Sequence, residues 1–156
     1  MELLQLELSD IEEFTGFEDL EVIDIDLKVL PMELRAAFFT EFIAFVRDNV
    51  DGFDKKVAVH KTMNFGYHLT YRTRLMMGNE KIAVPVLTGL KSESSGKTQA
   101  LIESRGTGGY ALLYDECTNG LDYTAIQYLS DEEHNTILAI SNINKSIDYN
   151  ISQMLF

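Results

Sequence analysis

The segment LEVIDIDLK, residues 20–28, constrains the fold more than any other part of the chain. Its β-branched and apolar residues predict a buried strand, yet that strand carries Asp24 and Asp26 two positions apart. Side chains at this spacing point to the same face of a strand. Burying unpaired carboxylates is costly, and two like charges push the pKa of one of them up. A shared Mg²⁺ or Mn²⁺ ion would offset that cost, whereas a solvated strand end is the alternative.

Periodic patterns in the rest of the chain predict an α+β fold, with helices packed on a mixed or antiparallel central sheet. A helix is expected over residues 31–50, where a proline stands at the first turn and apolar residues recur at helical spacing. The residues expected to face the sheet are Leu34, Phe38, Phe42, Phe45 and Val46.

A second helix is expected over residues 129–143, where a Ser130-Asp131 cap precedes Glu133. On the alternating segment 67–74, His68 shares a face with Arg72 and Arg74. Further strands are expected at residues 55–60, 67–74, 81–87, 98–104 and 110–114.

The composition is that of one folded domain. The chain has 156 residues, and 46% of them are hydrophobic, which excludes a disordered tail. No apolar run approaches the roughly 20 residues of a membrane span, and the acidic N-terminus is unlike a signal peptide. The single cysteine, Cys117, excludes an internal disulfide and a cysteine-based zinc site. A cytoplasmic protein with no membrane partner is therefore expected.

The net charge of −12 argues against nucleic acid, but the charges are unevenly distributed. Residues 1–54 hold 15 acidic and 3 basic side chains, and residues 106–156 hold 7 acidic and 1 basic. Residues 55–105 hold 9 basic and 3 acidic side chains. If this middle third forms one sheet, it provides a basic face suited to phosphates. The alternative is that its cations pair with the acidic flanks.

Two further segments carry candidate site residues. His68 lies beside guanidinium groups on its strand face, an arrangement that can hold a phosphate; an exposed surface histidine is the alternative. Glu103 ends an apolar strand just before a glycine-rich turn that would let a ligand approach closely. Arg105 follows on the same face, so these two side chains could instead pair only with each other. His60 and His134 have no neighbouring guanidinium groups of this kind and are interpreted as structural or solvated.

Taken in order, three segments resemble the motifs of the archaeo-eukaryotic primase superfamily, specifically the primase–polymerase domains of phages, plasmids and mobile elements. LEVIDIDLK resembles the first motif, GYHLTYR the second and LIESRGTGGY the third. The resemblance covers roughly residues 14 to 142. It implies a primase–polymerase (RRM-like) catalytic core over residues 1–142, with residues 143–156 as a helix end or linker.

The resemblance implies that Asp24, Asp26 and Glu103 bind Mg²⁺ or Mn²⁺ and that His68 contacts the phosphates of a nucleotide. Lys61, Arg72 and Arg105 are our choices for contacts to the triphosphate or the template backbone, and the loop over residues 92–97 is a candidate cover for the site. The implied reaction is nucleotidyl transfer, either primer synthesis or DNA polymerisation. The implied partners are a dNTP or NTP, a single-stranded DNA template with its primer and, in a longer protein, a helicase module.

Two other functions stay open at this stage. The chain could be a catalytically inactive nucleotide- or DNA-binding module of a larger replication protein. It could also be a glycosyltransferase, because many of these enzymes hold their metal with an Asp-x-Asp pattern. That third hypothesis gives no role to His68 or to the Glu103–Arg105 strand, so it ranks last.

Overall fold

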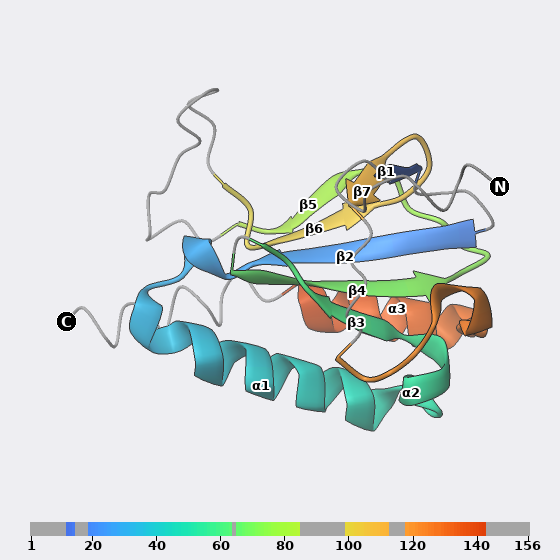
Figure 1. Cartoon of the computed structure of the whole chain (residues 1–156), viewed down its shortest axis with the longest axis horizontal. Coiled ribbons are helices and arrows are strands. Elements are labelled where there is room, and N and C mark those ends of the chain that lie inside the picture. The colour runs from blue at the N-terminus through green and yellow to red at the C-terminus, as the bar shows by residue number, and fades with distance from the viewer. Residues whose placement is uncertain (1–11, 15–18, 64, 85–98, 113–117, 143–156) are drawn as a thin grey trace, which may run out of the picture.

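The computed structural model describes residues 12–14, 19–63, 65–84, 99–112 and 118–142. Within these residues the chain is an α+β protein built on a five-stranded antiparallel sheet (Figure 1). Across the sheet the order of strands is β3 (Ala58–Lys61), β4 (Gly66–Arg72), β2 (Leu20–Asp26), β6 (Ile102–Arg105) and β5 (Glu80–Ala83). The expected loop over residues 92–97, the end segment 143–156 and Cys117 lie outside the described residues.

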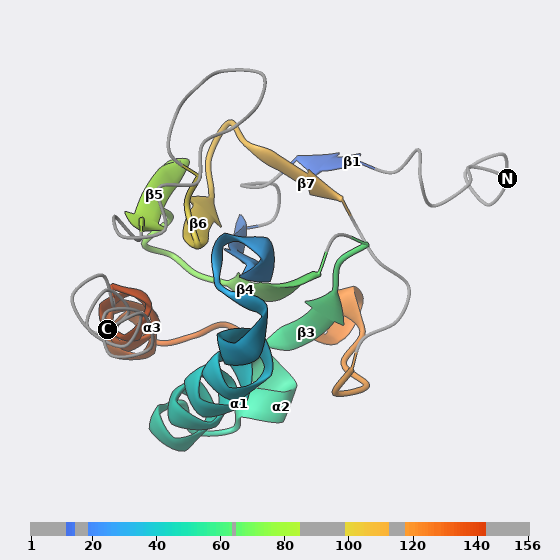
Figure 2. The ribbon, with the colours of Figure 1, turned by 90° about the vertical axis from the view of Figure 1, so that its left-hand side faces the viewer.

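Helices cover one face of this sheet. The two longer ones are α1 (Met32–Asn49) and α3 (Asp131–Ser141), and the short α2 (Phe53–Lys56) follows α1. Figure 2 shows all three on the same side of the sheet, while a two-stranded pair formed by β1 (Glu12–Phe14) and β7 (Tyr110–Leu112) lies on the other side. Two 3-10 helices, at Leu27–Val29 and Tyr123–Ala125, complete the described elements.

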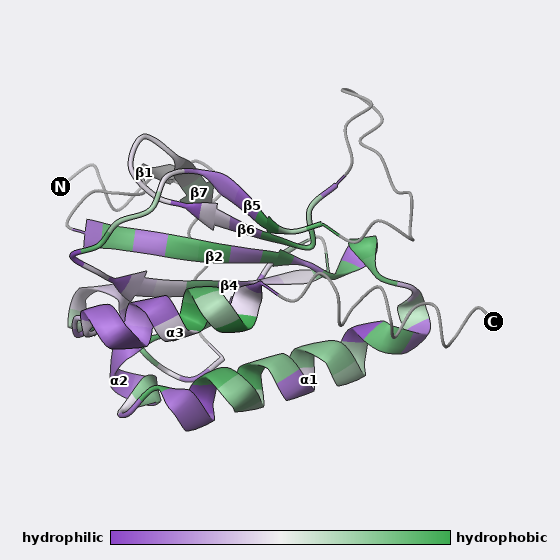
Figure 3. Cartoon of the chain, turned by 180° about the vertical axis from the view of Figure 1, so that it is seen from behind, coloured by the Kyte–Doolittle hydropathy of each residue, from purple (hydrophilic) through white to green (hydrophobic). Residues whose placement is uncertain are grey.

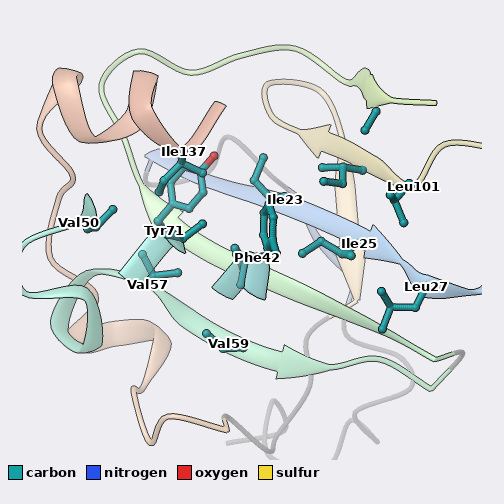
Figure 4. Close-up of a cluster of buried hydrophobic side chains, with 14 of the residues drawn as sticks. Ile23, Ile25, Leu27, Phe42, Val50, Val57, Val59, Tyr71, Leu101 and Ile137 are labelled. Atoms are coloured by element: carbon teal, nitrogen blue, oxygen red, sulfur yellow. The ribbon is translucent and has the colours of Figure 1, made fainter. Parts of the chain in front are cut away.

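The core lies between the sheet and the helices. Ile23 and Ile25 of β2 are fully buried and belong to the same apolar cluster as Phe42 and Val46 of α1 and Ile137 of α3 (Figure 4). Because side chains alternate along a strand, this burial turns Asp24 to the opposite face of the sheet. Figure 3 shows the result along β2, where hydrophilic bands interrupt a hydrophobic strand.

The opposite face is itself partly covered by residues 118–129. Ile126 packs against Leu20 of β2 and Ala58 of β3, forming a small second apolar cluster. Leu129 N–H donates to the carbonyl of Arg72 at 2.9 Å, which ties the end of this segment to β4. The face around Asp24 is therefore bounded on one side by a packed segment that the strand patterns did not predict.

Most predicted elements are confirmed, with local corrections. The strand over residues 20–26 is β2, the long helix is α1, and Ser130 caps α3 in a capping box with Glu133. The strand expected at residues 55–60 is partly wrong, because Lys55 and Lys56 end α2 and the strand begins at Ala58. Phe45 was expected in the core but is 58% exposed.

Among the described residues, no helix combines the length and apolar character needed to cross a bilayer.

Candidate functional site

Five ionisable side chains, which we call the ionisable row, cross the central sheet at the level of Asp24. In the strand register Asp24 lies opposite His68 of β4 on one side and Glu103 of β6 on the other. His60 of β3 and Lys81 of β5 extend the row to the two edge strands. Directly opposed residues in antiparallel strands share a face and have Cβ atoms about 5 Å apart. The sheet thus brings together three predicted site residues from distant parts of the sequence.

The two acids of the row are accessible on the face away from α1 and α3. The side chain of Asp24 is 32% exposed and that of Glu103 is 23% exposed. Their strand neighbours Ile23 and Ile102 are fully buried on the other face. Each carboxylate is therefore held by a rigid strand and open to solvent, as binding of a ligand requires.

His68 contacts Asp24 but is more buried than its sequence predicted. Its Nε2 lies 3.4 Å from Asp24 Oδ1, longer than a typical hydrogen bond, and the residue is 7% exposed. The polar residues on its strand face argued for an exposed position. That interpretation is wrong, because β4 lies inside the sheet and His68 is flanked by His60 on β3 and Asp24 on β2.

His60 was interpreted as structural or solvated because no guanidinium group neighbours it in the sequence pattern, and it lies directly opposite His68. It is 1% exposed, and its ring stacks on Tyr123 with the ring centroids 4.7 Å apart. Its Nδ1 has no hydrogen-bond partner among the described residues. Burial, together with the nearby His68, lowers the pKa of His60 to about 4. His60 is therefore a neutral, structural member of the row at neutral pH.

Glu103 is engaged by its own strand neighbour. Arg105 Nη2 donates to Glu103 Oε2 at 2.6 Å, and both side chains are partly exposed. The ion pair between Glu103 and Arg105, which was the alternative interpretation of these two residues, is therefore present. A ligand of Glu103 would have to displace Arg105 or share the carboxylate with it.

Asp26 has a local structural role beside the row. Its Oδ1 accepts a hydrogen bond from Lys28 N–H at 3.1 Å and so caps the 3-10 helix Leu27–Val29. Burial raises the pKa of Asp26, and the negative charge of Asp24 adds a smaller upward push. An upward shift was expected from the paired charges, but burial contributes more to it than the pairing does.

Lys61 and Arg72 are not brought into the row. Lys61 pairs in register with Tyr67, one position beyond His68, so alternation sends it to the opposite face. Arg72 shares the face of His68 but lies four residues along β4, about 13 Å away. Its guanidinium donates to the carbonyl of Tyr123 at 3.3 Å.

The expected basic face is also not formed as predicted. Lys56 lies on α2 and pairs with Glu133 of α3 at 2.8 Å, as the alternative interpretation allowed. Arg74 lies over the ring of Tyr128, 4.3 Å from its centroid. The described cations of residues 55–105 are thus divided between the two sides and the end of the sheet.

Glycines beside the site make room for the backbone of the protein itself. A Cβ at Gly66, just before the His68 segment, would lie 2.3 Å from the carbonyl oxygen of Ile25. A Cβ at Gly106 would lie 1.7 Å from that of Met77. The close approach expected near Gly106 is therefore made by a neighbouring loop, which holds the end of β6 in place.

The donor set suits a hard divalent cation, but its geometry is not preassembled. Asp24, Asp26 and Glu103 offer carboxylate oxygens, the ligands that Mg²⁺ and Mn²⁺ prefer. In the described parts of the chain, however, no group of three or more His, Cys, Asp or Glu side chains is arranged to hold a metal ion. A metal ion at Glu103 would therefore either displace Arg105 or share the carboxylate with it.

The sequence interpretation missed a third acidic residue of β2, Glu21, which is fully buried on the helix side. Its Oε1 accepts from Tyr71 Oη at 2.5 Å and lies 2.7 Å from His134 Nε2, and its Oε2 accepts from Met77 N–H at 2.6 Å. The signal was available, because Glu21 has the same strand parity as Ile23 and therefore faces the core. His134, interpreted as structural or solvated, is structural.

No family model, curated protein or solved structure matches the chain.

Proposed function

We propose that this chain is a primase–polymerase-like domain that catalyses metal-dependent nucleotidyl transfer on a single-stranded DNA template. The observation that supports the proposal most is the position of Asp24 between His68 and Glu103 in one row of the sheet. Each of the three motif-like segments contributes one member of that row. A chance resemblance of three separate segments gives no reason for this convergence.

The architecture agrees with what the resemblance implies. Helices occupy one face of an antiparallel sheet, and the acids of the row are partly exposed on the other. Such a sheet leaves one face for nucleotides while its packed face supplies rigidity. Catalysis of phosphoryl transfer depends mainly on positioning and charge stabilisation, which a rigid row of charged side chains can provide.

In this proposal Asp24, Asp26 and Glu103 hold Mg²⁺ or Mn²⁺, which would neutralise charge on the triphosphate and activate the attacking 3′-hydroxyl. His68 contacts a phosphate oxygen beside Asp24, whose Oδ1 lies 3.4 Å from the Nε2 of the imidazole. Arg105, once freed from Glu103, provides a bidentate contact to phosphate. Lys61 and Arg72 lie outside the row, so in this proposal they contact nucleic acid away from the reacting atoms, Arg72 four residues along β4 from His68.

A second function, an inactive nucleotide- or DNA-binding module, is favoured by one specific observation. Glu103 is already neutralised by Arg105 at 2.6 Å, and this ion pair would stabilise a binding face without metal. The two proposals share the row and differ in whether divalent ions bind to it. Metal dependence therefore separates them.

Calorimetric titration of a non-hydrolysable dNTP in the presence and absence of Mn²⁺ tests the proposal. Wild-type protein is expected to bind the nucleotide only with Mn²⁺, and Asp24→Asn is expected to abolish that binding while leaving the fold unchanged. A suitable control is Asp48→Asn, because Asp48 is an exposed acid on α1, on the other side of the sheet.

Metal-independent nucleotide binding that survives in Asp24→Asn would favour the inactive module. A well-folded wild-type protein that binds no nucleotide under either condition would contradict both proposals.

A further inference from the structure

The turn between β3 and β4 exposes two large apolar side chains at the edge of the candidate site. Met63 is 83% exposed and Phe65 is 71% exposed. Gly66, the next residue, lies opposite Asp26 in the register of β4 with β2. The turn therefore emerges beside the acidic end of the site, next to the 3-10 helix Leu27–Val29 (Figure 1).

The backbone of Phe65 is in an unfavourable conformation. Its φ is +58°, a left-handed value that bulky residues rarely adopt. Hydrogen bonds fix this geometry: Leu27 N–H donates to the carbonyl of Phe65 at 3.2 Å, and Thr62 N–H donates to that of Gly66 at 2.9 Å. Glycine or asparagine would suit this position better, so the aromatic side chain costs both backbone strain and exposed apolar surface.

Two exposed cations lie on the chain segments that adjoin this turn. Lys61 ends β3 just before the turn, and Lys28 follows the residue whose N–H binds Phe65; both are exposed. Proteins bind single strands with exposed aromatic side chains in a cationic neighbourhood, because bases stack on the ring while phosphates meet the positive charges. An exposed carboxylate surface alone would repel such a strand.

We propose that Met63 and Phe65, with Lys28 and Lys61 on the adjoining segments, form a stacking platform for the bases of single-stranded DNA. This inference rests on the proposed function and gives the template strand a point of contact beside Asp26. Two side chains cannot supply the roughly 1,200 Å² or more that a stable protein interface buries, so a second copy of the chain is a poorer occupant.

The chain contains no tryptophan, which allows a direct test. Phe65→Trp places a single fluorescent reporter on the platform, and an oligothymidylate is titrated against it. Stacking is expected to quench the tryptophan emission. The matched control is Phe45→Trp, because Phe45 is 58% exposed but lies on α1, on the other side of the sheet; its emission is expected to stay unchanged.

Binding measurements on Phe65→Asn complete the test. Asparagine tolerates a positive φ, so the turn is expected to keep its shape while the ring is lost. Oligothymidylate affinity should fall about 5- to 150-fold, the value of one stacked base, whereas Phe45→Asn should change it less than about twofold. Mn²⁺-dependent nucleotide binding should be retained in Phe65→Asn.

Unquenched emission from the Phe65→Trp variant at saturating oligonucleotide, or wild-type affinity in Phe65→Asn, would overturn the platform. If nucleotide binding with Mn²⁺ persists in that case, the proposed function stands and this inference alone fails. A wild-type protein that binds neither oligonucleotide nor nucleotide would overturn both. Loss of self-association in Phe65→Asn, without an effect on oligonucleotide affinity, would overturn the platform by assigning the turn to a protein interface instead.

Discussion

The carboxylates on the two faces of the central sheet differ in burial and in hydrogen bonding. On the helix side, Glu21 is fully buried, and its two oxygens are matched by Tyr71, His134 and the Met77 amide at 2.5 to 2.7 Å. On the other side, Asp24 is 32% exposed and its contact with His68 is 3.4 Å long. Both acids lie on β2, three residues apart.

This difference separates a carboxylate that stabilises the fold from one that can take up a ligand. A buried carboxylate must have its hydrogen bonds satisfied within the protein, and the partners of Glu21 satisfy both of its oxygens. Asp24 keeps solvent contact and a loosely placed partner, so a ligand can replace water there at little structural cost. Substitution of the two residues should therefore affect different quantities.

The largest expected effect on stability is that of Glu21→Ala. The change leaves two buried polar groups, of Tyr71 and His134, and the partly buried Met77 amide without their acceptor, and it should lower the free energy of unfolding by about 3–5 kcal/mol. Urea denaturation followed by circular dichroism measures this loss. Asp24→Asn should lower the free energy of unfolding by less than about 1 kcal/mol, because a partly exposed side chain keeps water as a hydrogen-bond partner.

Equal destabilisation by Glu21→Ala and Asp24→Asn would contradict the distinction between the faces. Glu41→Ala is a control for removal of an acid, because Glu41 is exposed on α1.

The acid stability of the protein should depend on His60. This residue is buried and neutral with a pKa of about 4, whereas in the unfolded chain it takes up a proton near pH 6.5. The unfolded state therefore binds more protons between these values, and stability falls as the pH drops from 6.5 towards 4. The difference between these two pKa values corresponds to a loss of about 3 kcal/mol in the free energy of unfolding.

His60→Phe tests this dependence, because phenylalanine keeps a ring to stack on Tyr123 but cannot take up a proton. The difference in unfolding free energy between variant and wild type should grow in favour of the variant as the pH falls from 6.5 to 4. A constant difference across that range would show that His60 does not titrate on unfolding.

Asp26 should show the smallest effect on stability, with the opposite dependence on pH. Because its pKa is raised in the folded state, that state binds more protons, and stability falls as the pH rises from 3.8 through the raised pKa. Asp26→Asn keeps a side chain able to cap the helix Leu27–Val29 and removes the buried charge. The variant should be as stable as wild type at pH 7, or up to about 1 kcal/mol more stable.

The same variant should bind Mn²⁺ more weakly, as calorimetry would reveal. Stability gained and metal affinity lost together would mean that the buried charge of Asp26 is retained for binding. Unchanged Mn²⁺ affinity would leave Asp26 with its capping role alone.

The local patterns predicted the elements well where one physical rule was decisive. The alternation of β2 and the capping box at Ser130 are both present as expected. The prediction that Phe45 faces the sheet was wrong, because the apolar stripe of α1 is wider than the surface that the sheet and α3 cover. The cover formed by residues 118–129 was not predictable, because it depends on backbone hydrogen bonds to strands distant in sequence.

The site was predictable to the extent that it depends on strand parity. Parity alone places Asp24 and Asp26 on one face, but the register between strands decides which residues oppose them. That register brings in His60 and the Glu103–Arg105 pair, and it leaves Lys61 and Arg72 outside the row. Pair register is set by turns and packing over the whole sheet, which a single sequence does not reveal.

Extension of a labelled primer on a single-stranded template tests the central claim most directly. The wild-type protein is expected to extend the primer with Mn²⁺ or Mg²⁺, and Asp24→Asn should slow extension by at least about 100-fold, since charge stabilisation by a metal is worth several kcal/mol. The variant's unfolding free energy should stay within about 1 kcal/mol of wild type. Unchanged extension by a folded Asp24→Asn protein would contradict the assignment of the ionisable row as a nucleotidyl-transfer site.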